Sequence, residues 1–425
     1  MYTRSWKDIK YPSNRNELMN IELWLKSKQL DDGAEGLWRI HDDLYDLTSF
    51  VDKHPGGSMW LLLTKNSDVT EAFEAHHFTK SAENTLPKFF VRKAILPRHY
   101  PFTFHPNGFY RILKEKARKY FNYKMPPTST TSKIFLDFYF FSSIFLCILA
   151  AELENIKLAI LAGMFFAFVV TCGHNFVHMK DSWRTYYYYC VSFSVREWRI
   201  SHCLSHHLFP NTLEDLEISL FEPVFEWLPK QNKKLIVRFG SWLYFPLVGM
   251  VLPFFQVGNR IRNGVFMKED YLMFLPLYLM IIFGKSVIYS FFLWLLVISV
   301  CGFIFSVIGL TAAHHDTEIF HEGDKPREDR DWGLHQVDAT RDRREIIGNK
   351  YVGLIVFGEH TLHHLFPTID FCYLQQLLPI YYETLEEFGI ELNVKPIANI
   401  FFNSFLQLAR INPNLITRKQ KQKDI

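Results

Sequence analysis

The chain has 425 residues, of which 48% are hydrophobic and 17% are aromatic, and its net charge is only +3. This composition is apolar even for a large soluble core and indicates contact with lipid. The small net charge, without a long basic block, excludes the electrostatic footprint of a nucleic-acid-binding protein. Six scattered cysteines without a C-x-x-C pair favour reduced core residues over a disulfide framework.

The first predicted domain covers residues 20–96 and contains a His-Pro-Gly-Gly turn at His54–Gly57. An aromatic and acidic segment, Trp38–Phe50, precedes the turn, and a D-x-T-x-x-F segment, Asp68–Phe73, follows it. Together these segments resemble the haem-binding module of cytochrome b5, which is a small α+β domain.

The resemblance to cytochrome b5 implies two axial histidine ligands for a haem b. His54 would be the first ligand. The spacing in desaturase-fused versions of the module implies that His77 is the second, with His76 as the fallback. A haem with two axial histidines has no open position for oxygen, so its function is electron transfer.

Residues 97–131 contain five prolines and a basic helical segment, residues 111–119. Proline-rich composition with a basic helix is typical of a linker that lies at a membrane surface. The N-terminal residues 1–7 lack the apolar stretch of a secretory signal, so we expect internal segments to drive insertion and the first domain to stay cytosolic.

Apolar runs then predict about four transmembrane helices in two hairpins. Residues 134–151 and 156–172 are each near the length that crosses a bilayer, and a short acidic loop joins them. Residues 271–283 and 286–310 form the second, tilted hairpin. A further stretch, residues 238–257, is interrupted by two prolines and is predicted to be interfacial or re-entrant, with a true span as the alternative.

The charges that flank the apolar runs predict which side of the membrane they face. Lys180, Arg184, Arg196 and Arg199 follow the second run, so the positive-inside rule places this end in the cytosol. Each hairpin returns the chain to the same side. The C-terminal run Lys421-Gln-Lys-Asp-Ile resembles a dilysine retrieval signal. We therefore expect a multi-pass protein of the endoplasmic reticulum membrane with cytosolic N- and C-termini.

Eight of the eighteen histidines lie in three clusters beside the apolar runs. Side chains three or four residues apart share one face of a helix, so each cluster can direct two or three imidazoles at one point. Eight imidazoles exceed the ligand set of one zinc ion, and imidazole is a ligand that suits iron, which favours a non-haem di-iron site. The clusters are His174 and His178; His202, His206 and His207; and His360, His363 and His364.

Residues of about 30 to 375 resemble the cytochrome b5-fused membrane fatty-acid desaturases of the front-end class. The HPGG turn, the three clusters, the segment Arg330–Gln336 and the run His363–Pro367 carry this resemblance. It implies a desaturase domain at 132–380 with a cytosolic helical metal-binding cap, followed by a cytosolic tail at 381–425.

The same resemblance implies a reaction and its partners. Two irons held by the histidine clusters would use O2 to remove two hydrogens from a fatty acyl chain, carried as acyl-CoA or in a phospholipid. The haem would pass electrons from an NADH-cytochrome b5 reductase. Cleaving an unactivated C–H bond needs an oxidant that a metal cofactor can supply and side chains cannot.

A ninth ligand is predicted at His314, which follows the last apolar run much as an extra histidine does in acyl-CoA desaturases. His315 and His335 are its competitors. The acidic run Glu214–Glu217 after the second cluster predicts either carboxylates that orient the ligands or a solvated turn.

Two positions depart from the common front-end pattern. The first cluster has Asn175 where relatives commonly carry aspartate, and the third begins with His360 where many have glutamine. Substrate and regiochemistry therefore stay open. Two alternative functions also stay open: a lipid hydroxylase with the same metal chemistry, and a membrane-anchored electron carrier whose desaturase domain is inactive. A zinc-dependent hydrolase is disfavoured because it would not need a haem domain.

Overall fold

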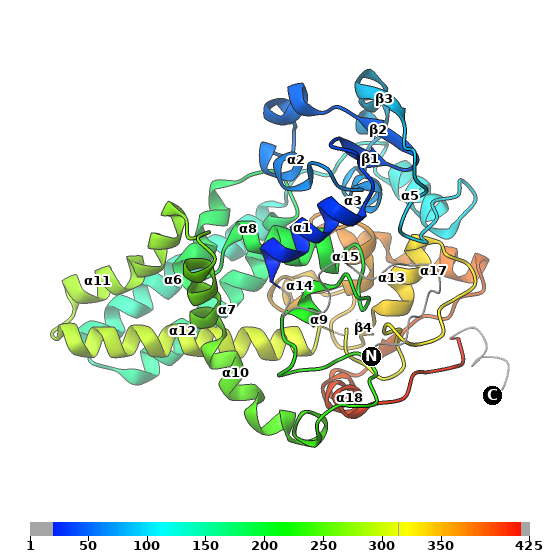
Figure 1. Cartoon of the computed structure of the whole chain (residues 1–425). Coiled ribbons are helices and arrows are strands. Elements are labelled where there is room, and N and C mark those ends of the chain that lie inside the picture. Colours follow the sequence, from blue (N-terminus) through cyan, green and yellow to red (C-terminus); the bar gives the residue numbers. More distant parts are fainter. Residues whose placement is uncertain (1–19, 313, 418–425) are drawn as a thin grey trace.

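The computed structural model describes residues 20–312 and 314–417. Helices dominate it, as Figure 1 shows, and a small N-terminal domain sits on a helical cap from which long apolar helices extend to one side. The lysines of the expected dilysine signal, Lys421 and Lys423, lie outside the described residues.

The N-terminal domain combines a three-stranded antiparallel sheet with short helices, which makes it α+β. Strand β1 pairs with β2 through Trp38 and Tyr45, and β2 pairs with β3 through Asp43 and Lys93. Trp38 is buried in the core between sheet and helices. In chain order the elements are α1 (Ile21–Asp31), β1 (Trp38–Ile40), β2 (Asp43–Tyr45), η1 (Thr48–Lys53), α2 (Ser58–Thr64), α3 (Thr70–His76), α4 (Ser81–Thr85), η2 (Leu86–Phe89) and β3 (Phe90–Lys93).

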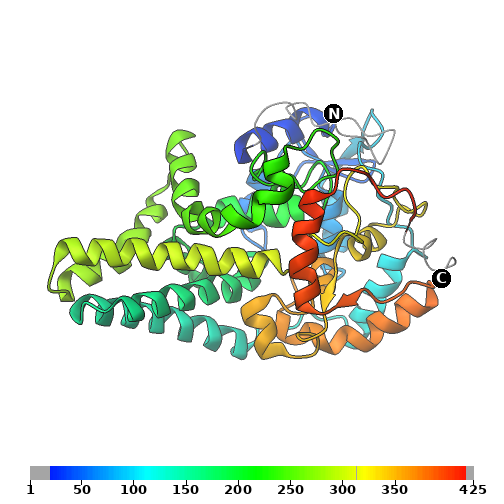
Figure 2. The same cartoon turned by 90° about the horizontal axis from the view of Figure 1, so that it is seen from below.

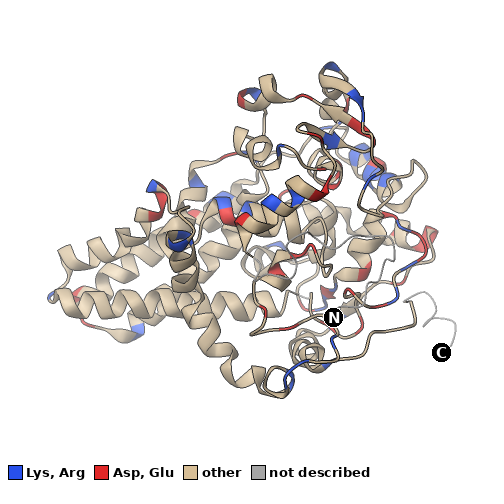
Figure 3. Ribbon diagram, viewed as in Figure 1, with Lys and Arg blue, Asp and Glu red and all other residues tan. Residues whose placement is uncertain are grey.

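In the described part of the chain, four helices are long and apolar enough to cross a membrane: α6 (Thr130–Glu152), α7 (Ile156–Val177), α10 (Leu235–Arg262) and α12 (Val287–Leu310). Helices α6 and α7 form a hairpin, and α12 packs against α7. Charged residues are concentrated in the cap and in the N-terminal domain, whereas the long helices are almost free of them along their lengths (Figure 3). This separation of charge matches a helical membrane protein with a polar cap.

The segment expected to be the first half of the second hairpin is shorter in the structure than a membrane span. The segment 271–283 was expected to span the membrane, but it contains the end of η5 (Lys268–Phe274) and α11 (Leu275–Phe283), which has only nine residues. Helix α10 has 28 residues and runs across α12 in Figure 1, whereas α11 packs beside α6 and α12. By length and composition, α10 therefore fits a true span, the alternative to an interfacial or re-entrant segment.

The cap gathers the short elements that lie between and after the long helices, as the view from below in Figure 2 shows. The last two described elements are part of it, because β5 pairs with β4 and α18 packs against α10. The cap consists of η3 (Trp183–Val191), α8 (Val195–Trp198), the π-helix η4 (Arg199–His206), α9 (Leu216–Ser219), α13 (Trp332–Ala339), β4 (Asp342–Arg343), α14 (Lys350–Val356), α15 (His360–Leu365), α16 (Phe371–Leu374), η6 (Gln375–Leu377), α17 (Leu378–Glu387), β5 (Val394–Lys395) and α18 (Ile397–Ala409).

The segment expected as a linker holds the two parts together through α5 (Phe109–Tyr120). One face of α5 is apolar and packs against α13 and α17 of the cap. Its basic side chains pair with carboxylates of the N-terminal domain: Arg111 and Lys114 with Glu74, and Arg118 with Glu83. Arg111, Lys114 and Arg118 thus contact the N-terminal domain, whereas Lys116 pairs with Glu383 and Glu387 of α17 in the cap.

Candidate metal and haem sites

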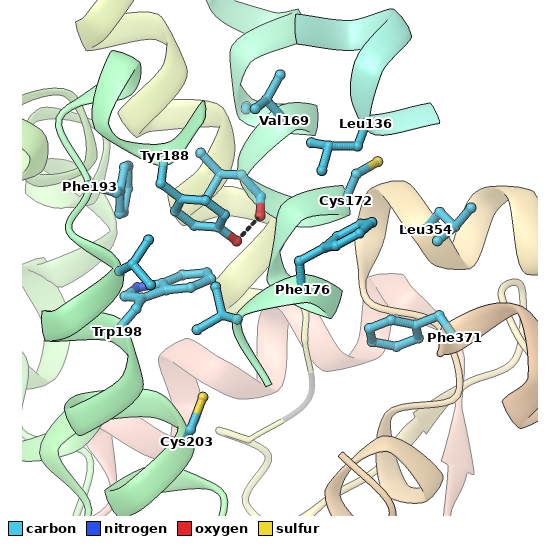
Figure 4. Close-up of a cluster of buried hydrophobic side chains, with 14 of the residues drawn as sticks. Leu136, Val169, Cys172, Phe176, Tyr188, Phe193, Trp198, Cys203, Leu354 and Phe371 are labelled. Atoms are coloured by element: carbon cyan, nitrogen blue, oxygen red, sulfur yellow. Dashed lines mark hydrogen bonds between the residues drawn. The ribbon is translucent and has the colours of Figure 1, made fainter. Parts of the chain in front are cut away.

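The first histidine cluster lies at the end of α7, where the long helix enters the cap. His174 is in the last turn and His178 is the C-cap residue, so the two imidazoles share a face, with 3.2 Å between their Nε2 atoms. A buried apolar wall surrounds this end of the helix (Figure 4), and Tyr188 in that wall donates a hydrogen bond to the carbonyl of Val170 at 2.7 Å. The rings of Trp198 and other aromatic residues of the wall contact His174 and exclude water from it.

The second cluster lies on the π-helix η4, and this local geometry divides its three histidines. The amide of His207 donates to the carbonyl of His202 at 2.8 Å, which is the five-residue spacing of a π-turn. Residues five apart then share a face, and the Nε2 atoms of His202 and His207 lie 3.0 Å apart. His206 points to a different partner, Nε2 of His314, at 3.1 Å.

The third cluster lies on α15 and is divided in the same way. His360 and His364 are four residues apart and face the second group, whereas His363 faces the first. The structure therefore collects nine buried imidazoles into two groups. The first group contains His174, His178, His202, His207 and His363. The second contains His206, His314 and His364, with Nε2 of His360 2.5 Å from Nε2 of His314.

The donor set fits two metal ions. Among the described residues, the ligand nitrogens of the first group lie within 4.8 Å of one another, and so do those of His206, His314 and His364 in the second. A third set of the same spacing, His202, His206 and Glu217, lies between the two groups. Imidazole bonds of about 2.1 Å place donors up to roughly 4.2 Å apart across an ion, so nitrogens at this spacing need only small shifts to share a metal ion. A set of imidazoles without a thiolate is suited to iron, copper, nickel or zinc, and five imidazoles exceed the usual coordination of zinc.

Carboxylates and an amide hold the outer nitrogens of several of these histidines. Nδ1 of His202 lies 2.5 Å from Glu217, and Nδ1 of His206 lies 2.9 Å from Asp215. Nδ1 of His364 lies 3.0 Å from the side-chain oxygen of Gln336. Such partners fix the tautomer that presents Nε2 to a metal. The acidic run after the second cluster is thus largely buried against the ligands rather than being a solvated turn.

Burial and mutual proximity keep most of these imidazoles neutral. Burial, followed by the neighbouring histidines, lowers the pKa values of His207 and His364 well below their ordinary range, so their lone pairs are available to a metal. His206 is the exception. Burial lowers its pKa, but the charges of Asp215 and Glu217 outweigh this effect and raise the pKa to about 9. A metal at this position would have to displace a proton.

The two histidines expected to hold haem face each other in the N-terminal domain. The ring centres of His54 and His77 lie 6.1 Å apart, close to the roughly 6 Å that two imidazoles would take on opposite sides of one ion at bonds of about 2 Å. Nδ1 of His54 donates to the carbonyl of Gly57 and Nδ1 of His77 to that of Phe73, each at 3.0 Å. These bonds leave Nε2 of each ring for an iron, so the residues fit the haem.

The other candidate histidines lie apart from both metal groups. The ring of His315 stacks on Trp227 with 3.6 Å between centres, and Nε2 of His335 hydrogen-bonds to the carbonyl of Pro210 at 3.1 Å.

Sequence reasoning did not assign a role to Gln336, although the residue ends one of the family-like segments. Asn175, at one of the two departures, accepts a hydrogen bond from the amide of Phe371 and so joins α7 to α16.

Comparisons with known proteins agree with this arrangement. The model of the fatty acid desaturase family matches residues 156–396, and that of the cytochrome b5-like haem/steroid binding domain matches residues 24–95. No solved structure is significantly similar to the chain.

Similar proteins match over nearly the whole length. The cytochrome b5-related protein of Drosophila melanogaster is 40% identical, over 97% of this chain and 98% of its own length. A probable Delta(5) fatty acid desaturase of Dictyostelium discoideum is 25% identical over 95% and 93%, and an acyl-lipid (8-3)-desaturase of Mortierella alpina is 22% identical over 88% and 92%. The chain is a membrane protein that belongs to the fatty acid desaturase family and carries an N-terminal cytochrome b5 domain.

Proposed function

We propose that this chain is an oxygen-dependent fatty acyl desaturase with a histidine-ligated di-iron centre and an internal haem donor. The observation that carries the proposal is the division of nine buried imidazoles into two groups of ligand spacing, beside a domain in which two further histidines face each other. Two irons, when bound, would activate O2 and supply the oxidant for C–H cleavage.

The residues assigned to each cofactor follow from their positions. We assign haem b to His54 and His77. We assign one iron to His174, His178, His202, His207 and His363, and the other to His206, His314, His360 and His364. Asp215 and Glu217 would orient ligands, and the aromatic wall around His174 would keep water from the centre.

The partners follow from the same assignment. The substrate is a fatty acyl chain on CoA or in a phospholipid, the electrons come from an NADH-cytochrome b5 reductase, and the protein resides in the endoplasmic reticulum membrane with both termini cytosolic. The docked N-terminal domain supports a fixed position for the electron donor, because ion pairs join α5 to this domain while α5 also packs against the cap.

Metal and product analysis of the full-length protein tests the proposal. The protein is purified in detergent, and haem and total iron are measured; we expect one haem and two further irons per chain. Cells that express the chain should then contain new double bonds in their acyl lipids. The matched control is the His206→Ala, His363→Ala double variant, which lacks one ligand from each group.

Each other outcome identifies a different function. Iron confined to the haem, after attempted reconstitution, would identify an electron carrier. Zinc in the two groups would indicate hydrolysis, and hydroxylated rather than unsaturated acyl chains would identify a hydroxylase. Any of these results would overturn the proposal.

A further inference from the structure

His76 lies between the histidine assigned to haem and the first metal group. It is bonded through the backbone to His77, and its ring stacks on that of His178 with 6.2 Å between centres and 21° between planes. Nδ1 of His76 is held by the carbonyl of Ala72 at 3.1 Å. Its buried Nε2 has no hydrogen-bond partner among residues 20–312 and 314–417. His76 is therefore oriented by its own helix while its ring contacts the desaturase domain.

Contacts from both domains hold His76 in this position. The ring of Trp60, on α2, also packs against His76, with 5.5 Å between ring centres and 47° between planes. The guanidinium of Arg199 lies 4.7 Å from the Trp60 ring centre. The carbonyl of His76 also accepts a hydrogen bond from the hydroxyl of Thr368, just after the third cluster, at 3.3 Å.

The turn that contains His54 is fixed against the same surface. Arg199 pairs with Asp181 at 2.7 Å, and the Asp181 carboxylate occupies the space where a Cβ on Gly57 would lie. Gly57 has a φ of +107°, which an L side chain rarely adopts, so a glycine serves both the turn and the close approach. The ring of His76, tilted against Trp60 and stacked on His178, thus lies in an assembled interface between the two domains.

Two other roles for His76 do not match this geometry. As a haem ligand it would have to face His54, but His77 occupies that position. As a ligand of the first metal group it would have to place a nitrogen among those of the group, but its ring stacks flat beside His178 and it is outside the group. A neutral imidazole between two redox sites has a simpler use, because electron tunnelling weakens steeply with every gap that lacks bonded or contacting atoms.

We propose that His76 is the positioning residue that conducts electrons from the haem held by His77 to the iron held by His178 and its group. In each transfer a ferrous haem loses one electron and becomes ferric, while one ferric ion of the centre becomes ferrous; no bond breaks and no proton moves. The NADH-dependent reductase restores the ferrous haem. This inference rests on the proposed function, since it assumes both cofactors.

Stopped-flow reoxidation of the haem tests the proposal in the full-length protein loaded with both cofactors. The haem is reduced anaerobically through the reductase and mixed with oxygenated buffer that contains acyl substrate, and its absorption is followed. Wild-type protein should show a fast reoxidation phase that disappears when zinc replaces the non-haem iron. His76→Ala should lose the fast phase, and His76→Phe should recover part of it because an aromatic ring again fills the gap.

Two controls separate conduction from structural damage. His76→Ala should match wild type in haem content, haem midpoint potential and non-haem metal content. His105→Ala, a change at an exposed histidine of the segment that follows the N-terminal domain, should leave the fast phase intact. A fast phase that survives in His76→Ala would overturn the proposal, and so would a loss of haem or metal in that variant. Absence of the fast phase in wild type would instead contradict the proposed function itself.

Discussion

The carboxylate of Asp215 accepts a hydrogen bond from Nδ1 of His206 at 2.9 Å and is itself held by the backbone amide of Asn211 at 2.8 Å. His206 is thus aimed into the second metal group by a residue that sits nine positions later in the chain. Because the carboxylate is buried, its charge acts on the imidazole with little screening from water.

Replacing Asp215 should weaken metal binding at the second group. Loss of such an orienting carboxylate typically costs about ten- to a hundredfold in metal affinity or activity, so Asp215→Asn should release metal at lower chelator concentration than wild type. Metal retained after dialysis against graded chelator measures the effect. Asp42→Ala is the matched control, because its side chain is 74% exposed and remote from the ligands. Equal retention by Asp215→Asn and wild type would refute an orienting role.

The two cofactor sites should be separable by substitution. His54→Ala or His77→Ala should abolish the haem absorption spectrum while the non-haem metal stays bound, since the two sites share no ligand. His206→Ala or His363→Ala should lose non-haem metal while the haem absorption spectrum is unchanged. Absorption spectra and elemental analysis of the same samples check both directions. Haem loss in the variants of the metal groups, with metal retained, would contradict the assignment.

His314 should be required for only one of the two metals. His314→Ala removes an imidazole from the second group. We expect the metal of the second group to be lost while the first group keeps its ion. Its neighbour provides the control, because the ring of His315 stacks on Trp227 and faces neither group. His315→Ala should keep both metals. Elemental analysis distinguishes the two variants. Loss of metal only from His315→Ala would show that His315, and not His314, is the ligand.

The stability of the folded chain should depend on pH through Lys114, which lies where α5 contacts the N-terminal domain. Burial lowers its pKa to about 7, although Glu74 partly opposes this effect. The unfolded chain, with a lysine pKa near 10.5, therefore binds more protons between pH 7 and 10.5, and this residue makes stability rise with pH in that window by up to about 1.4 kcal/mol per pH unit.

Replacement of Lys114 by methionine should remove this dependence. Lys114→Met keeps most of the side-chain length without the charge, so its apparent midpoint of thermal unfolding relative to wild type should be highest at pH 7 and should decline toward pH 9. The midpoints are compared in detergent at one scan rate. The control is Lys116→Met, at a more exposed position on the same helix. A midpoint of Lys114→Met that rises relative to wild type between pH 7 and pH 9 would contradict the prediction.

Much of the site could be read from the order of residues. The spacing of His174 and His178, and of His360 and His364, already places each pair on one face of a helix. The HPGG turn and the later histidine indicated a haem module, and the length of the apolar runs indicated membrane helices. These inferences succeed because they depend on helical periodicity and on transfer of side chains from water, which act over a few turns of chain.

Tertiary structure decided how the histidines are shared between the two groups. A regular α-helix would separate His202 and His207 by more than a third of a turn, but the π-helix of η4 brings their Nε2 atoms within 3.0 Å. His314 joins His206 only because α12 delivers it to the cap from 108 residues away. Local sequence preference does not encode either result.

The sequence by itself determined which chemistry the chain can carry, because residue type sets ligand preference and redox role. Only the folded structure decided which imidazoles meet, that α5 turns its basic residues toward Glu74 and Glu83, and that His76 stacks on His178. Those contacts join segments distant in sequence. Burial of the apolar faces of α5 and the cap brings the two domains together. Each charge that is buried in this way then needs a partner.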